Sequence, residues 1–191
     1  TQRVEEELAL LFPEARILRM DADTTMSRYA HEDKLAAFSH GDYEIMLGTQ
    51  MVAKGLDFPR VTLVGVISAD QQLYNDDYRS LERTFALLTQ VVGRSGRGAI
   101  KGRAVIQTLT PENPVIRLAA NQDYDAFYQT EILLRKAMVY PPYCDLLCIG
   151  FVGGKEAQVA AASKCFLEQM KALSQWEYPE QKFIVLGPMP P

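Results

Sequence analysis

The sequence has no apolar run approaching the roughly 18 to 20 residues that a membrane-spanning helix needs. Its first residues, Thr-Gln-Arg-Val-Glu-Glu-Glu, form neither a signal-peptide core nor an Arg-rich transit pattern. We therefore expect no membrane partner and a cytoplasmic location. The chain also starts without Met and stops at residues 188–191, directly after an apolar run, which we interpret as the mark of an excised fragment.

Cysteine is scarce, and its spacing excludes two kinds of site. Cys144, Cys148 and Cys165 are an odd number and contain no Cys-x-x-Cys pair. This pattern indicates neither a disulfide framework nor a zinc site. We expect three buried free thiols and no metal site in this chain.

Excess positive charge is absent overall, since the formal net charge is −4. This charge argues against wrapping of nucleic acid by the entire surface. Between residues 79 and 103, however, six basic residues stand against one acidic residue, Glu82. The sequence therefore predicts a local basic face in this stretch.

Short apolar runs alternate with amphipathic stretches, as in βα units that feed a parallel sheet. The pattern predicts an α/β domain over 1–112, with its helices and strands as follows: helices over 4–11, 31–38 and 78–92, and strands over 16–20, 44–47, 62–67 and 102–109. The run at 62–67 does not alternate, which predicts a strand buried on both faces. The helix over 78–92 has apolar residues at every third or fourth position.

Two prolines in Thr110-Pro111-Glu112-Asn113-Pro114 mark the best domain boundary. Beyond it, we predict linker helices over 113–140, including one over 124–139, and then a partial α+β domain over 141–191. That domain is expected to be a βαβ fragment, with strands over 145–152 and 183–186 and a helix over 155–173. The aromatic cluster at 124–128 has helical spacing, which favours packing between domains over a base-stacking platform.

The most specific motif is Gln-Val-Val-Gly-Arg-Ser-Gly-Arg-Gly at residues 90–98, at the end of a predicted helix. Arg94 and Arg97 can point the same way beyond the helix, while Gly93 and Gly96 leave room for close approach. Guanidinium is planar, permanently charged and bidentate, so the pair suits the charge on a transferred phosphoryl group. The alternative is two solvated arginines in a flexible loop.

A second motif follows the predicted strand that ends at residue 47. Residues 48–59 read Gly-Thr-Gln-Met-Val-Ala-Lys-Gly-Leu-Asp-Phe-Pro, which places hydrogen-bond donors at the carboxyl edge of a parallel sheet, where α/β domains bind ligands. Asp57 could accept from a ribose hydroxyl or orient an arginine. A simple turn between two core strands is the alternative.

Taken together, these two motifs, about 40 residues apart, resemble motifs V and VI of superfamily 2 helicases. Further segments resemble the primosomal replication-restart helicases, the primosomal protein N′ family: residues 16–25, 61–66, 82–90 and 140–142. The resemblance runs through essentially the whole chain. It implies a RecA-like parallel-sheet helicase lobe 2, followed by the start of the family's carboxyl-terminal domain.

The resemblance implies an ATP-driven 3′-to-5′ DNA helicase that recognises stalled forks and reloads the replication machinery. The implied partners are forked and single-stranded DNA, primosome proteins and single-stranded DNA-binding protein. ATP-driven translocation without strand separation fits the same motifs and stays open. A metabolic nucleotide-binding enzyme is disfavoured, because residues 21–25 lack a Gly-rich loop after the first strand.

Carried over by motif, the resemblance also implies a role for each site residue. Arg94 and Arg97 would face ATP across the cleft, and Gln90 would orient the nucleotide or the attacking water. Gly55 and Asp57 would lie on the nucleotide side. The DNA phosphate backbone would be contacted by residues of the second motif: Thr49, Gln50 and, more loosely, Lys54.

Two departures from the family pattern are Leu56, where His is common, and Ser68-Ala69-Asp70, where Asp-Ala-Asp is usual. The chain has neither a Walker A lysine nor an Asp-Glu box. A first lobe would therefore bind most of the ATP and Mg²⁺, and the isolated chain is not expected to hydrolyse ATP. The family's zinc-binding cysteines would also lie outside this chain.

Overall fold

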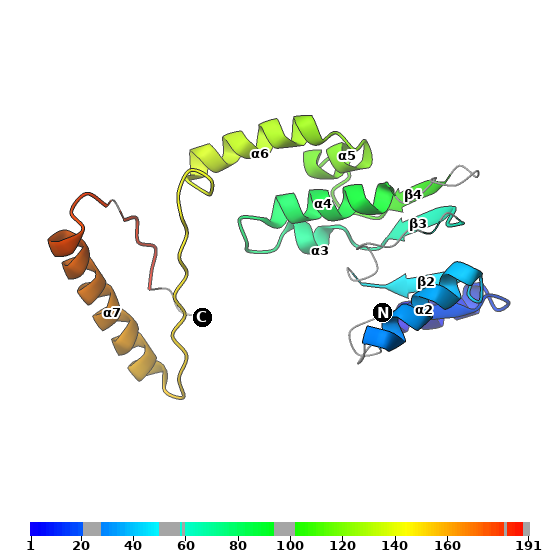
Figure 1. Ribbon diagram of the computed structural model, residues 1–191, viewed down its shortest axis with the longest axis horizontal. Helices are drawn as coiled ribbons and strands as arrows, with labels where there is room; N and C mark the ends of the chain where they lie inside the picture. The colour runs from blue at the N-terminus through cyan, green and yellow to red at the C-terminus, as the bar shows by residue number, and fades with distance from the viewer. Residues whose placement is uncertain (21–27, 50–57, 59, 94–101, 182, 189–191) are drawn as a thin grey trace. The chain divides into compact units, whose positions relative to one another are not determined.

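The structure is a computed structural model that describes residues 1–20, 28–49, 58, 60–93, 102–181 and 183–188. It divides into two compact units, Thr1–Cys144 and Asp145–Pro191. The first unit is mixed α/β with parallel strand pairs, so the predicted α/β class is confirmed (Figure 1).

The first strand pair lies near the start of the chain. The elements are α1 (Gln2–Leu11), β1 (Ile17–Met20), α2 (Arg28–His40) and β2 (Ile45–Gly48). Strands β1 and β2 run parallel, with Ile17 opposite Ile45. Just before both strands, the Arg16 guanidinium lies 2.6 Å from the Glu44 carboxylate, and the Arg16 backbone N–H also donates to that carboxylate. This ion pair fixes the two strand starts together.

The second strand pair carries most of the helices of this unit. Its elements are β3 (Leu63–Val66), α3 (Asp70–Leu73), α4 (Ser80–Val92), β4 (Arg103–Ile106), α5 (Pro114–Ala120) and α6 (Tyr124–Met138). Strands β3 and β4 are parallel, with Leu63 opposite Arg103. Helix α4 packs against both strands and against α3 and α5 (Figure 1).

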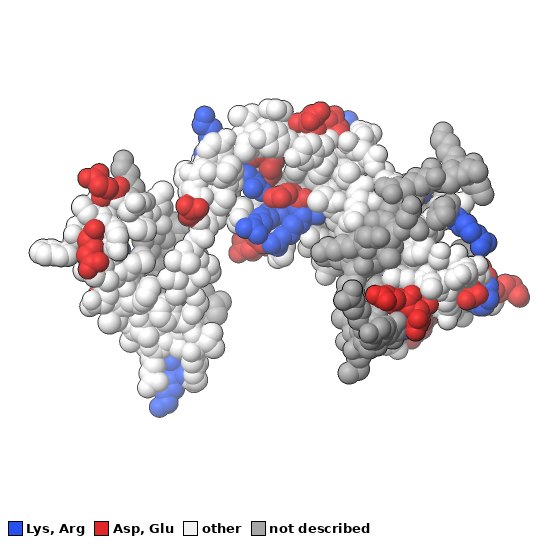
Figure 2. All heavy atoms as spheres, viewed as in Figure 1, with Lys and Arg blue, Asp and Glu red and all other residues white. Residues whose placement is uncertain are grey.

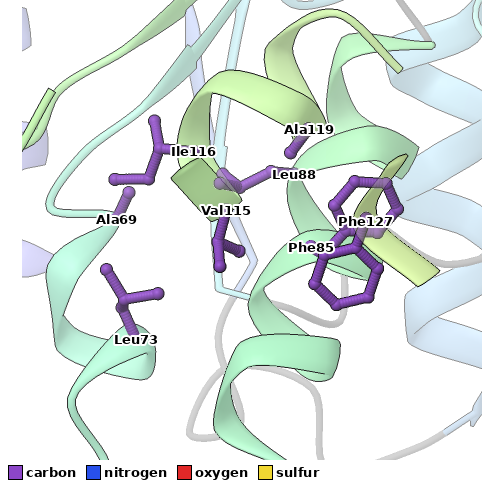
Figure 3. Close-up of a cluster of buried hydrophobic side chains, with 8 residues drawn as sticks. All are labelled: Ala69, Leu73, Phe85, Leu88, Val115, Ile116, Ala119 and Phe127. Atoms are coloured by element: carbon purple, nitrogen blue, oxygen red, sulfur yellow. The ribbon is translucent and has the colours of Figure 1, made fainter. Parts of the chain in front are cut away.

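One cluster of buried side chains joins these helices (Figure 3). The Phe85 ring from α4 stacks on the Phe127 ring from α6, with centroids 4.0 Å apart. The remaining members of the cluster come from α3, α4 and α5 and the residue before α3: Ala69, Leu73, Leu88, Val115, Ile116 and Ala119. Helices α5 and α6 therefore share one core with α4. The predicted domain boundary at residue 112 stays a prediction.

The prediction that the strand at 62–67 is buried on both faces is wrong. Leu63 is 63% exposed and Ile67 is 59% exposed, whereas Val66 packs against the core. A continuous apolar run makes a strand suitable for a sheet covered on both sides. Only the face toward α4 is covered among the residues that the structure describes.

The second unit contains α7 (Glu156–Glu177), which confirms the predicted helix. The segments 145–152 and 183–186 are not strands among the described residues, so the two predicted strands of the βαβ fragment are not formed here. An α-helix pairs its own backbone groups, but a strand needs a neighbour for its hydrogen bonds. The Phe151 and Phe166 rings meet edge to face, with centroids 5.5 Å apart.

The prediction of buried thiols is also wrong. Cys148 and Cys165 are exposed, and Cys144 is half-buried, with its thiol donating to the Val139 carbonyl at 2.8 Å. All three cysteines are free. They lie in or next to the second unit, where no described residue is buried.

Across the parts of the chain described above, no helix combines the length and apolar character that crossing a bilayer would require.

Candidate functional site at the end of helix α4

Helix α4 ends where the sequence predicts the arginine motif to begin. Gln90 lies half-buried in its last turn, and Gly93 follows as the C-cap. The Gly93 N–H donates to the Thr89 carbonyl at 2.9 Å. The motif therefore starts at a helix end, as predicted. Arg94 and Arg97 lie outside the described residues, and their roles stay predictions.

The second motif begins at the carboxyl end of β2. Thr49 follows Gly48, the last residue of that strand, and its side chain is exposed. This edge of a parallel pair is where α/β folds commonly place ligand contacts. The other predicted residues of this motif lie outside the described residues: Gln50, Lys54, Gly55 and Asp57.

The chain leaves the second motif against the end of α2. The Phe58 and Phe38 rings meet edge to face, with centroids 5.0 Å apart. The Arg60 guanidinium donates to the His40 carbonyl at 3.3 Å. A cation at the carboxyl end of a helix is favourable, because the last carbonyls carry partial negative charge. These contacts fix one end of the motif.

Asp70 occupies the carboxyl edge of the second strand pair. Its carboxylate accepts from the Leu109 N–H and from the Thr108 hydroxyl, at 2.9 and 2.8 Å, and from the Thr110 hydroxyl at 2.9 Å. The Leu109 N–H is the main cause that lowers the pKa of Asp70, partly opposed by desolvation. Donors within the chain thus hold this carboxylate, which ties the end of β4 to α3.

Sequence reasoning missed Gln122, in the turn between α5 and α6. Its side-chain N–H donates to the Thr89 carbonyl in the last turn of α4, at 3.3 Å. The sequence Asn121-Gln122-Asp123 signals a turn, but it gives no sign of which helix the middle side chain reaches. Contact with the motif-bearing helix is therefore visible only in the fold.

Two of the three described cations of the predicted basic stretch, Arg79 and Arg83, have side-chain partners within the protein. Arg83 lies 2.6 Å from Asp77, and the Arg79 guanidinium donates to the Tyr78 hydroxyl at 2.6 Å. In the middle of Figure 2, Lys and Arg side chains lie next to Asp and Glu side chains. The described residues thus present mixed charge, while Arg94, Arg97 and Lys101 lie outside them.

An open hollow of about 520 Å³ lies beside the C-terminal end of α4. Among the described residues, Arg117 is its one charged lining residue, and the Thr108 hydroxyl adds a polar group. The other lining residues are mostly apolar: Val92, Gly102, Ala104, Ile106, Pro111, Ile116 and Ala120. A hollow with so few polar groups has little means of fixing a phosphate.

Comparison with known proteins defines the class. Residues 1–99 match the family described as helicase conserved C-terminal domain. The chain belongs to this family.

More specifically, the chain is similar to proteins named Replication restart protein PriA. It is 50% identical to that of Bacillus subtilis over 172 residues, which covers 90% of this chain and 21% of the relative. It is 39% identical to that of Thermotoga maritima over 172 residues, which covers 88% of this chain and 23% of the relative. The predicted resemblance to this family is confirmed. The chain spans about a fifth of the length of these relatives.

Among solved structures, the chain aligns with the C-terminal domain of the DEAD-box protein Dbp5. The TM-score is 0.43 at 18% identity, covering 71% of this chain and 78% of that one.

Proposed function

We propose that this chain is the second motor lobe of an ATP-dependent 3′-to-5′ DNA helicase that acts at stalled replication forks to restart replication. The observation that carries the proposal is the 50% identity to a replication restart protein over 90% of this chain. The helicase family match over residues 1–99 supports the same conclusion, since it takes in both motifs.

In this proposal, Arg94 and Arg97 act on the γ-phosphoryl group of ATP. Their guanidinium groups would stabilise the negative charge that develops during phosphoryl transfer. Gln90 would orient the nucleotide or the attacking water from the last turn of α4. Its half-buried position at a helix end supports this role. A helix holds its side chains in a more defined position than a loop does, and packing neighbours restrict their rotamers.

The second motif would serve both nucleotide and DNA. Gly55 and Asp57 would lie beside the ribose or the arginines. Thr49, Gln50 and Lys54 would contact the DNA phosphate backbone. The exposure of Thr49 at the end of β2 supports a contact with an external ligand.

ATP and Mg²⁺ would be held mainly by a first lobe outside this chain, because the sequence has no Walker A lysine and no Asp-Glu box. The chain by itself would then be inactive as an ATPase. Its wider partners would be forked DNA, primosome proteins and single-stranded DNA-binding protein. Within it, residues 1–112 would form the helicase lobe, 113–140 the linker helices and 141–191 the start of a further domain.

The decisive experiment replaces Arg94 or Arg97 by Ala in the full-length protein. DNA-stimulated ATP hydrolysis should fall by about 10³-fold or more, as for other arginine fingers, while DNA binding persists. Lys at either position should restore little, because it lacks the planar bidentate fork. Arg3→Ala is the matched control, since its side chain is 88% exposed on α1. Full turnover in both Ala variants would refute the proposed arginine roles.

Strand separation needs its own assay. The full-length protein should displace a labelled strand from a forked duplex when ATP is supplied. ATP-driven movement along single-stranded DNA without any strand displacement would contradict the helicase proposal and indicate a translocase.

A further inference from the structure

The turn between α5 and α6 contains an unusual residue for its conformation. The Asp123 N–H donates to the Leu118 carbonyl at 2.9 Å, and the Gln122 N–H donates to the Ala119 carbonyl at 3.1 Å. These two bonds form the Schellman pattern, in which the residue after the cap adopts a left-handed conformation. Gln122 has φ 56°. Glycine is usual there, because any side chain raises the energy of that conformation.

The Gln122 side chain uses this position to reach another helix. Its amide donates to the Thr89 carbonyl at 3.3 Å. That carbonyl also accepts from the Gly93 N–H at 2.9 Å. A Cβ on Gly93 would lie 2.8 Å from the Gln122 amide nitrogen, so glycine leaves the space that the amide fills. The contact therefore involves both ends of the last turn of α4.

The turn that carries Gln122 is itself firmly held. On the α5 side, Val115, Ile116 and Ala119 are buried in the core. On the α6 side, the Asp123 carboxylate accepts from the Ala126 N–H at 3.1 Å and caps the helix. Helix α5 also packs against α4 (Figure 1). The side chain of Gln122 thus extends from a rigid support.

We propose that Gln122 is a positioning residue, which fixes the last turn of α4 and with it the direction in which the chain leaves Gly93. This inference rests on the proposed function, since the residues that follow directly are the arginines assigned to ATP. Gln122 acts through Thr89 and Gly93 and contacts neither nucleotide nor DNA. Displacement of a reacting group by about 1 Å can cost up to about 10²-fold in rate, so a small shift here would be measurable.

The test separates positioning from stability by using the left-handed conformation. In the full-length protein, Gln122→Gly removes the amide and relieves the backbone strain. We expect an unchanged or higher melting temperature together with a kcat for DNA-stimulated ATP hydrolysis lowered about tenfold. The KM for ATP should stay within about twofold, because a first lobe would hold most of the nucleotide.

Two further variants and one control sharpen the result. Gln122→Lys keeps a donor for the Thr89 carbonyl and should restore most of the kcat. Gln122→Glu loses the donor and places a negative charge at the carboxyl end of α4, so its kcat should be the lowest of the three. Gln129→Ala, an exposed glutamine on α6, should match the wild type.

Wild-type kcat in both the Gly and the Glu variant would overturn the inference while leaving the proposed function intact. A lowered kcat in the Lys variant equal to that of the Gly variant would also overturn it, because the donor would then be irrelevant. Absence of DNA-stimulated ATP hydrolysis in the wild-type protein would instead refute the proposed function.

Discussion

Ten described hydrophobic side chains are buried in the first unit, Thr1–Cys144, whereas no described residue of Asp145–Pro191 is buried. Both units nevertheless contain long helices. In α7, Trp176 is 86% exposed and Leu173 is 51% exposed. Helical structure in the second unit therefore forms on local hydrogen bonds, with no buried core among the residues that the structure describes there.

Strands, unlike helices, depend on a partner segment elsewhere in the chain. In the first unit, β1 pairs with β2 and β3 pairs with β4. Each parallel pair forms hydrogen bonds between the backbone groups of its two strands. In the second unit, the apolar segments at 145–152 and 183–186 have no strand partner among the described residues. The difference shows that helices follow from sequence pattern, while strands depend on a neighbour being present.

The largest expected effect tests the core of the first unit. Phe85→Ala removes a ring that is 4% exposed and stacks on Phe127, so the free energy of unfolding should fall by about 3 to 5 kcal/mol. Urea unfolding followed by circular dichroism measures it. Tryptophan fluorescence is unsuitable, because the single tryptophan, Trp176, lies in the second unit.

The matched change in the second unit is Trp176→Ala on α7. Its exposed ring should contribute within about 0.5 kcal/mol to the same free energy. Equal losses in the two variants would contradict the contrast between a unit with a core and a unit without one.

A smaller effect is expected at Arg135, close to the end of the first unit. Its guanidinium donates to Glu131 at 2.8 Å, to Glu82 at 2.6 Å and to the Pro141 carbonyl at 3.2 Å. Arg135→Ala leaves the Glu131 side chain, 9% exposed, without its cation, which should cost about 3 kcal/mol of unfolding free energy.

Two controls test that explanation. Adding Glu131→Gln to the Arg135 variant should recover part of the loss, because the uncompensated buried charge is gone. Arg3→Ala breaks an ion pair whose side chains are 88% and 60% exposed, so it should change the unfolding free energy by less than about 1 kcal/mol. No recovery in the double variant would show that lost packing, rather than charge, causes the destabilisation.

The sequence predicted most helices of the first unit because their apolar spacing is local information. Phe85 and Leu88, identified by that spacing in the helix at 78–92, are indeed buried. Helix α5 was harder to predict from the sequence, because the asparagine and the proline at its start also fit a break between two domains. Asn113 caps the helix by accepting from the Val115 N–H, and Pro114 is its first residue. Both residues favour a helix start as much as a turn.

The candidate site was only partly predictable. Motif spacing placed Gln90 at the end of a helix and Thr49 after a strand, as the structure has them. Gln122 contacts Thr89 across 33 positions of the chain, and no local pattern encodes such a contact. Side chains that position a motif from another element become visible only once the elements are packed.

The smallest expected effect concerns Glu44, whose ion pair with Arg16 joins the starts of β1 and β2. Hydrogen bonds from Arg16 lower the pKa of Glu44 from its ordinary value of 4.5 to about 2. Because the folded-state pKa is the lower one, the pair stabilises the fold above pH 4.5, and this contribution is lost as the pH falls to about 2. Both groups are exposed, so the effect is small.

An NMR titration of the Glu44 carboxyl carbon checks this prediction. Arg16→Gln should move the midpoint only part of the way back to the ordinary range of a glutamate, because the backbone N–H of residue 16 still donates to the carboxylate. The difference in stability between wild type and Glu44→Gln should be constant above pH 4.5 and shrink below it. A stability difference that does not change with pH would contradict this prediction. It would show that the pair contributes through packing and not through its charge.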